Sequence, residues 1–376
     1  MNKKILFYYS KLGLGGAERS LTRFMNALSK DGNEVTLLTR YGGGSGIGDL
    51  DNKIRVMSFS SSSDFTKKRG IPHIFGRVRS ELEKLFFERF CLIKREHFDL
   101  MVLGSHGKSP YPMLRIFDID KCIKCIRNDL KSCAGHESGI KVIRKYRDKI
   151  DGYLCVSGTV KESLDSAVPE EAEKSFVLYN FLEPDKIREK INQSENPYED
   201  DGMLHIVSVC RVSNVSKGIF RMIDVCERLV NNGLKFKWYL VGDGEDLAEA
   251  KNRINEKKIG DYFISVGKKD NPFGFYKYSD LVAVLSYYEG LCGIVNEAKI
   301  AGAAVIATEF SGIHEQLDNG VSGWIVENSE EAIYEKMKEL IEKPELITQV
   351  KNQIYPEEIL NDELKLEKFY SVLGWK

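Results

Sequence analysis

The sequence predicts an α/β fold of two doubly wound, Rossmann-like parallel sheets that face a cleft. Three observations support this expectation. The chain has 376 residues, which is more than one ordinary core needs. Apolar strand-like runs alternate with helical patterns, which is typical of parallel sheets covered on both faces. The alternation is interrupted by a polar stretch near residues 179–202 and then starts again.

The first half of the chain carries one such alternation. Strands are expected at residues 4–9, 34–39, 53–59, 100–104, 122–126, 152–156 and 175–178, with helices that include residues 17–29 and 78–96. The helix at 78–96 is amphipathic and carries Lys and Arg residues beside Leu85, Phe86, Phe87 and Phe90. We expect its apolar face to be buried in the domain, and contact with a membrane surface is the alternative.

The second half repeats the pattern. Its expected strands are residues 204–210, 236–241, 262–266, 281–285, 305–307 and 323–326, and its helices include 218–231, 245–255, 292–301 and 330–340. We therefore divide the chain into a first domain at residues 1–185 and a second at residues 186–356. Residues 357–376 resume a helical pattern, and periodicity alone does not decide whether this closing helix packs back on the first domain.

Composition indicates a soluble globular protein, with 42% hydrophobic and 30% charged residues. Residues 1–10 predict a first strand rather than a signal peptide, and the eight cysteines fit a reducing compartment, so we expect a cytoplasmic protein. Residues 1–150 hold 29 Lys/Arg and 16 Asp/Glu, a net charge of +13, whereas the remainder carries −14. A basic half suits an anionic membrane surface or an acidic acceptor, and no nucleic-acid partner is expected.

Two glutamates, Glu289 and Glu297, stand eight residues apart between two strand-like runs. The expected crossover helix at 292–301 places Glu289 just before its start and Glu297 about two turns inside it. A helix start offers unpaired N–H groups and a positive dipole end to a phosphate. Carboxylates on either side could bind hydroxyl groups, so the segment has the shape of a nucleotide-sugar site. For two glutamates alone, a solvated helix surface is the simpler interpretation.

A second group of candidates follows the first strand of the second half. Arg211 and Lys217 lie on one strand–helix loop, where a planar guanidinium and a compact ammonium could clamp a diphosphate. Glycine-rich loops at 13–19 and 242–247 also join strands to helices. Neither loop has the third glycine of a dinucleotide fingerprint, which disfavours an NAD-dependent dehydrogenase.

The order of these pieces resembles the retaining glycosyltransferases of family 4, which have the two-domain GT-B fold. The matching motifs are Gly15-Gly16-Ala17-Glu18-Arg19, Arg211 with Lys217-Gly218, Glu289-Gly290-Leu291-Cys292 with Glu297-Ala298, and Ser311-Gly312-Ile313-His314-Glu315. The resemblance covers nearly the whole chain, and the shared order is more specific than any one motif. It implies an acceptor-binding N-terminal domain and a donor-binding C-terminal domain.

The resemblance also implies roles for residues. Arg211 and Lys217 would neutralise the donor diphosphate as the leaving group departs, so no metal or other cofactor is expected. Glu297 would bind the ribose hydroxyls, and Glu289, the third expected catalytic residue, would contact the transferred sugar. The other expected donor contacts come from backbone groups and glycines: Gly16, Gly290, Leu291, Cys292 and Gly293.

Two positions depart from the family pattern. Cys292 stands where many relatives have proline. Arg127 stands where many relatives have a histidine that lines the sugar site, and an arginine cannot act as a general base. Arg127 could instead bind a phosphate or a carboxylate. Gly15, His106 and Arg127 are therefore the expected contacts to the sugar or the acceptor.

The resemblance predicts a retaining hexosyltransferase that takes a hexose or N-acetylhexosamine from a nucleotide-diphosphate sugar, with a UDP-sugar as the expected donor. The expected acceptor is a glycan or a polyprenyl-diphosphate-linked lipid in cell-surface polysaccharide synthesis. The basic N-terminal domain would lie on the inner face of the cell membrane. The alternatives are a GT-B-fold sugar-nucleotide epimerase or hydrolase, and a non-catalytic partner subunit.

Overall fold

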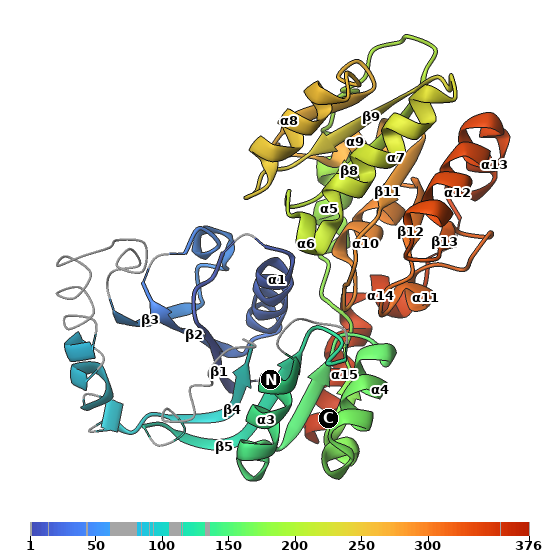
Figure 1. The fold of residues 1–376 in the computed structure, drawn as a ribbon. Helices are drawn as coiled ribbons and strands as arrows, with labels where there is room; N and C mark the ends of the chain where they lie inside the picture. The colour runs from blue at the N-terminus through green and yellow to red at the C-terminus, as the bar shows by residue number, and fades with distance from the viewer. Residues whose placement is uncertain are drawn as a thin grey trace. The chain divides into compact units, whose positions relative to one another are not determined.

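The computed structural model describes residues 2–375 except 14, 43, 61–80, 84, 90, 93, 105–113, 115, 132–135 and 354. The chain forms two compact units (Figure 1). The N-terminal unit comprises Met1–Phe181 and Asp362–Lys376, and the C-terminal unit comprises Leu182–Asn361. The chain therefore passes from the N-terminal unit into the C-terminal unit and back again, so its closing segment belongs to the unit in which it began.

A seven-stranded parallel sheet forms the centre of the N-terminal unit, in the order β3-β2-β1-β4-β5-β6-β7. The strands are β1 (Lys4–Tyr9), β2 (Glu34–Tyr41), β3 (Arg55–Ser60), β4 (His97–Leu103), β5 (Asp118–Ile126), β6 (Gly152–Cys155) and β7 (Ser175–Val177). The α-helices with defined bounds are α1 (Gly16–Lys30), α3 (His136–Tyr146), α4 (Gly158–Ala167) and α15 (Asp362–Leu373). The strand order reverses between β1 and β4, as in doubly wound folds.

The closing helix α15 is fixed to the N-terminal unit by an aromatic core. Phe24 of α1 stacks on Phe181 at a ring-centroid distance of 4.7 Å and meets the edge of Phe369 at 5.0 Å. Beside this cluster, the Tyr370 hydroxyl donates to Asp31 Oδ2 at 2.6 Å. Aromatic burial and a charge-assisted hydrogen bond therefore hold α15 against α1 and the residue that follows it.

The amphipathic segment expected at 78–96 is helical at residues 81–83, 85–89, 91–92 and 94. One side faces the unit: Phe87 meets Phe59 edge-on at 4.8 Å, and Cys91 is buried. The other side is exposed and carries the apolar residues Leu82, Leu85, Phe86 and Leu92, of which Phe86 is 75% exposed. The expectation that the apolar face is buried is therefore wrong for this second stripe, because the helix has apolar residues on two sides and only one of them packs against described residues of the unit.

The C-terminal unit has a six-stranded parallel sheet in the order β10-β9-β8-β11-β12-β13. Its strands are β8 (Leu204–Val209), β9 (Phe236–Val241), β10 (Phe263–Gly267), β11 (Leu281–Val284), β12 (Ala304–Thr308) and β13 (Trp324–Val326). The helices are α5 (Pro184–Asn192), α6 (Asn214–Lys217), α7 (Ile219–Asn231), α8 (Leu247–Glu256), α9 (Phe273–Tyr278), α10 (Gly293–Ile300), α11 (Ile313–Gln316), α12 (Glu330–Glu342), α13 (Pro344–Val350) and α14 (Glu357–Leu360). The prediction of two doubly wound parallel sheets is confirmed.

Two neighbouring strands of this sheet, β11 and β12, are buried along their whole length. Residues Leu281–Val284 of β11 and Ala304–Thr308 of β12 are buried at every position. The main core lies where β8, β9 and β11 meet α7 and α12, and it includes the buried side chains of Trp238, Ile223 and Met337. Strands covered on both sides leave the ends of the strands as the places where polar side chains can gather.

Candidate functional site

The candidate site of the C-terminal unit lies at the carboxyl ends of two adjacent strands. Strand β8 leads into the loop of Arg211 and Lys217, and strand β11 leads into the loop of Glu289. These strands pair in parallel, with β9 on the other side of β8. The strand order therefore reverses here, and crevices at such a switch point are where doubly wound sheets bind ligands.

Close backbone approach joins the two loops. Gly218 follows Lys217 with a positive φ of 65°, and a Cβ there would lie 2.8 Å from the Leu285 carbonyl oxygen. The Tyr287 N–H donates to the Ser216 carbonyl at 2.9 Å. The Lys217-Gly218 pair of the sequence motif is thus explained physically, because only glycine fits both the backbone angle and the space.

An ion pair connects the two loops at their side chains. Lys217 Nζ donates to Glu289 Oε1, which also accepts from Ser286 Oγ at 2.9 Å. The Lys217 and Glu289 side chains are only 19% and 16% exposed. Burial alone would lower the pKa of Lys217, but the nearby charge and hydrogen bond of Glu289 outweigh it and raise the pKa above its usual value.

Arg211 completes the charged group at the end of β8. Its side chain is exposed. Burial raises the pKa of the neighbouring Cys210 thiol to about 11, and the charges of Lys217, Glu289 and Arg211 all act on that thiol. The three residues expected to be catalytic are therefore close enough to influence the same thiol.

The glycines of the run 242–247 have a packing role beside this group. A Cβ at Gly242 would collide with the Cys210 carbonyl oxygen, and one at Gly244 would lie 2.3 Å from the Val212 carbonyl oxygen. The run is therefore a close-packed neighbour of the Arg211 loop, and its glycines support that loop by their lack of a side chain.

A buried amide binds the backbone at the start of α10. Cys292 precedes the helix, and its N–H donates to Gln316 Oε1 at 3.0 Å while its carbonyl accepts from Gln316 Nε2 at 2.8 Å. The Cys292 N–H, one of the expected donor contacts, is therefore hydrogen-bonded to Gln316. Gly290 and Leu291 are buried just before it, and Gly293 is the half-buried first residue of α10.

Glu297 is not a solvated helix residue. It lies in α10 with 6% of its surface exposed, and the Tyr276 hydroxyl of α9 donates to its Oε2 at 3.5 Å. A buried carboxylate needs hydrogen-bond donors, so Glu297 is suited to bind hydroxyl groups that reach it. The simpler interpretation of a surface glutamate is therefore wrong for this position.

The N-terminal unit holds the remaining candidates. Gly15 precedes α1 and Gly16 begins it; both are exposed, and a Cβ at Gly16 would meet none of the described residues within 4 Å. Arg127 follows β5, is 9% exposed, and its Nε has no hydrogen-bond partner within the described part of the chain. Burial raises the pKa of Tyr9 to about 12, with Glu18 and Arg127 both close enough to act on it. His106 lies outside the described residues.

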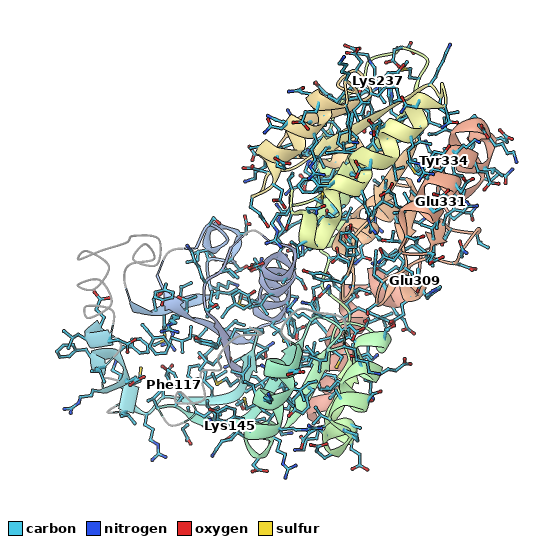
Figure 2. The ribbon with its side chains drawn as sticks, in the orientation of Figure 1. Phe117, Lys145, Lys237, Glu309, Glu331 and Tyr334 are labelled. Carbon is cyan, nitrogen blue, oxygen red and sulfur yellow. The ribbon has the colours of Figure 1, made fainter. Side chains whose placement is uncertain are left out.

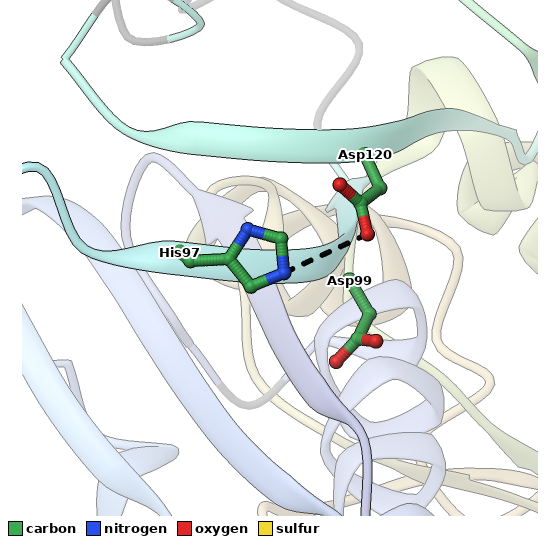
Figure 3. Close-up of side chains that lie close together, drawn as sticks. All are labelled: His97, Asp99 and Asp120. Carbon is green, nitrogen blue, oxygen red and sulfur yellow. Dashed lines mark ion pairs between the residues drawn. The ribbon is translucent and has the colours of Figure 1, made fainter.

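A separate acidic group lies at the amino ends of β4 and β5. His97, Asp99 and Asp120 come close enough together to offer ligand atoms to a metal (Figure 3). Asp99 Oδ1, however, accepts from Lys3 Nζ at 2.9 Å, and His97 Nε2 lies 3.6 Å from Asp120 Oδ2. Burial alone would raise the pKa of Asp99, but the hydrogen bonds from Lys3 and the Lys4 N–H outweigh it and lower that pKa. The group is an ion-pair network at the amino ends of β4 and β5, whereas the candidate residues of this unit follow the carboxyl ends of β1 and β5.

Comparison with known proteins identifies the C-terminal unit. Residues 187–356 match the family of glycosyl transferases group 1. The matched segment contains Arg211, Lys217, Glu289 and Glu297. Among solved structures, Anabaena HepE in complex with UDP-glucose superposes with a TM-score of 0.78 at 16% identity, covering 99% of this chain and 100% of that one. Staphylococcus aureus TarM gives 0.74 at 14% identity, covering 99% and 100%. The fold is GT-B.

Several curated proteins with similar sequences are named for the synthesis of surface polysaccharides. The Vi polysaccharide biosynthesis protein VipC/TviE of Salmonella typhi is 29% identical over 43% of this chain and 28% of its own length. The amylovoran biosynthesis glycosyltransferase AmsK of Erwinia amylovora is 28% identical over 41% of the chain and 38% of its own length. The chain thus spans about a third of these relatives. A Campylobacter jejuni N-acetylgalactosaminyltransferase named for an undecaprenol-linked glycan acceptor is 22% identical over 90% of the chain and 88% of its own length.

Proposed function

We propose that the protein is a retaining glycosyltransferase of family 4 that moves a hexose or N-acetylhexosamine from a UDP-sugar to a growing surface glycan. The observation that carries the proposal is the group of Arg211, Lys217, Glu289 and Glu297 at the switch point of the C-terminal sheet. Two cations and the carboxylate of Glu289 lie on the loops after β8 and β11, and the buried carboxylate of Glu297 lies on α10. We infer that the cations bind the diphosphate and that the carboxylates bind the hydroxyl groups of the sugar and the ribose. The match to group 1 glycosyl transferases and the UDP-glucose complex of HepE support this proposal.

In the proposed mechanism, Arg211 and Lys217 hold the diphosphate and stabilise the negative charge that develops when the sugar–phosphate bond breaks. The start of α10 at Gly293 adds its dipole to the same phosphates. Glu297 binds the ribose hydroxyls, and Glu289 orients the sugar. The acceptor hydroxyl attacks on the face from which the phosphate leaves, the leaving phosphate takes its proton, and the anomeric configuration is retained. The two cations supply the charge compensation, so we propose a reaction without a metal.

We propose that the N-terminal unit binds the acceptor, a glycan carried by a polyprenyl diphosphate. The acceptor named for the Campylobacter relative supports this choice. Arg127, whose buried Nε has no hydrogen-bond partner among the described residues, would contact the acceptor or the sugar together with Gly15 and Gly16. A guanidinium with free hydrogen-bonding capacity is suited to an anionic group such as the acceptor diphosphate.

We further propose that the exposed stripe of Leu82, Leu85, Phe86 and Leu92 rests on the inner membrane surface. Arg89 is exposed within the same helical stripe, and Lys94 and Arg95 are exposed at its end. Apolar side chains with basic neighbours favour the interface of an anionic bilayer. None of the described helices is long and apolar enough to cross a membrane, so this contact would be peripheral.

Vesicle flotation tests the membrane contact. Phe86→Glu should reduce binding to phosphatidylglycerol vesicles by at least about fivefold, because it places a charge on the apolar stripe and removes the large apolar side chain that would enter the bilayer interface. Val372→Glu is the matched control, because Val372 is also an exposed apolar residue, 45% exposed on α15. Equal binding by both variants would refute the assignment of this helix.

A donor screen tests the enzymatic proposal. The purified protein is incubated with UDP-, GDP- and ADP-sugars, and release of the nucleoside diphosphate is measured with and without a lipid-linked glycan. Lys217→Ala and Glu289→Ala should each lower turnover by about 100-fold or more, which is the range for removing a group that stabilises the transition state. Free sugar formed at the same rate without an acceptor would favour the hydrolase alternative. No binding or turnover of any nucleotide sugar would refute the enzymatic proposal.

A further inference from the structure

The cation expected to grip the donor phosphate already has an anion of its own. Lys217 Nζ and Glu289 Oε1 form an ion pair, and both side chains are more than four-fifths buried. A pair removed from solvent is screened less by water and salt than a surface pair. A phosphate that binds Lys217 must therefore compete with the Glu289 carboxylate.

The surrounding backbone fixes both partners of this pair. The Tyr287 N–H binds the Ser216 carbonyl, which ties the Glu289 loop to the Lys217 loop. The Ser286 carbonyl accepts from Thr308 Oγ1 at 2.6 Å, which ties the Glu289 loop to β12. The Ser286 hydroxyl then donates to the same oxygen of Glu289 that Lys217 uses. The carboxylate is thus held in place by a side chain that does not itself carry charge.

We propose that Glu289, positioned by Ser286, makes the site discriminate the sugar-carrying donor from the sugar-free nucleoside diphosphate product. This inference rests on the proposed function. When a nucleotide sugar binds, the sugar hydroxyls donate to Glu289 and replace Lys217, which turns to the diphosphate. When a nucleoside diphosphate binds alone, nothing replaces Lys217 at Glu289, so the lysine stays shared between carboxylate and phosphate. The product is therefore held more weakly and leaves.

The affinity of Glu289→Gln for UDP distinguishes a competing-anion role for Glu289 from a simple sugar-binding role. If Glu289 only bound sugar, Glu289→Gln would leave the affinity for UDP unchanged. If Glu289 competes for Lys217, the same substitution frees the lysine for the phosphate. UDP should then bind at least about fivefold more tightly, and the preference for UDP-glucose over UDP should fall by a similar factor. Ser286→Ala should act in the same direction with a smaller effect, because it loosens Glu289 without removing its charge.

Isothermal titration calorimetry provides the test, with UDP and, as sugar-bearing probes, UDP-glucose, UDP-galactose and UDP-N-acetylglucosamine. Glu331→Gln is the matched control. Glu331 lies on α12 (Figure 2), its side chain is 67% exposed, and its Oε2 accepts from Arg228 Nη2 at 2.8 Å. This substitution removes the same charge from the same unit but away from Lys217. The affinities of the Glu331→Gln variant for UDP and the UDP-sugars should therefore stay within about twofold of those of the wild type.

The outcomes separate this inference from the proposed function. Tighter binding of UDP by Glu289→Gln, without such a gain in Glu331→Gln, supports the competing-anion role. Unchanged or weaker binding of UDP by Glu289→Gln overturns it, and the proposed function stands if Lys217→Met still abolishes UDP binding. A wild-type protein that binds neither UDP nor any of the three UDP-sugars overturns both.

Discussion

Gln316 is the residue whose loss should most disturb the phosphate end of the site without touching a proposed ligand contact. Its side chain is 1% exposed and pairs with both backbone groups of Cys292, directly before α10. Its Nε2 also donates to Asn296 Oδ1, which in turn accepts from the Tyr355 hydroxyl. One amide therefore anchors the loop that carries Glu289 to the start of the helix that carries Glu297.

The magnitude follows from the groups that lose their partners. Gln316→Met keeps nearly the same volume but leaves the buried Cys292 N–H without its acceptor, whereas the Cys292 carbonyl still accepts from the Asn296 N–H. An unsatisfied buried polar group costs about 1–3 kcal/mol, so the C-terminal unit should lose about 1–3 kcal/mol of unfolding free energy. The freed loop should also weaken UDP binding, because the ligand would then have to order it.

Urea unfolding measures this loss. In a Trp375→Phe background, the tryptophans left are Trp238 and Trp324, both buried in the C-terminal unit, so their fluorescence reports that unit. Gln353→Met is the control, because Gln353 is exposed and its side chain donates, among the described residues, to the Gln349 carbonyl alone. It should change stability by less than about 0.5 kcal/mol. A loss below about 1 kcal/mol for Gln316→Met would refute the anchoring argument.

Two further predictions concern stability. Tyr370→Phe removes the hydroxyl that donates to Asp31 and accepts from Asn33, and it should destabilise the N-terminal unit by about 1–3 kcal/mol in thermal or urea unfolding; an unchanged midpoint would contradict the docking of α15. Burial lowers the pKa of Lys299 from 10.5 to about 8, with its Nζ on the Ser322 carbonyl. Since the unfolded lysine keeps its proton to higher pH, the unfolding free energy should rise between about pH 8 and 10.5, by at most about 1.4 kcal/mol per pH unit, and Lys299→Met should lack this rise. Equal pH slopes in both proteins would contradict it.

The sequence supports the fold and the place of the site for identifiable reasons. Continuous apolar runs such as those of β11 and β12 can be read directly, because strands buried on both faces have no polar positions. The eight-residue spacing of Glu289 and Glu297 across a strand–helix junction places both near one helix start. The glycine of Lys217-Gly218 can likewise be recognised in the sequence, since the positive φ of Gly218 and the close Leu285 carbonyl allow no side chain there.

Other parts of the site depend on contacts that no local pattern encodes. Gln316 reaches Cys292 across 24 positions, and its use of that N–H follows from the packing of α11 against the start of α10. The pairing of Lys217 with Glu289 spans 72 positions and appears only when β8 and β11 become neighbours. The helix that contains Phe86 is a further case. Its amphipathic pattern can be recognised in the sequence, but which of its two apolar sides is covered depends on the contact with Phe59.

A crystal structure of the protein with UDP-glucose or UDP tests the central claim most directly. The account predicts the diphosphate at the carboxyl ends of β8 and β11, with its oxygens about 3 Å from Lys217 Nζ and Arg211, and the ribose hydroxyls on Glu297. With the sugar present, Glu289 should contact sugar hydroxyls and no longer hold Lys217. A diphosphate bound elsewhere in the protein, or bound here with Glu297 contacting no part of the nucleotide, would contradict the account.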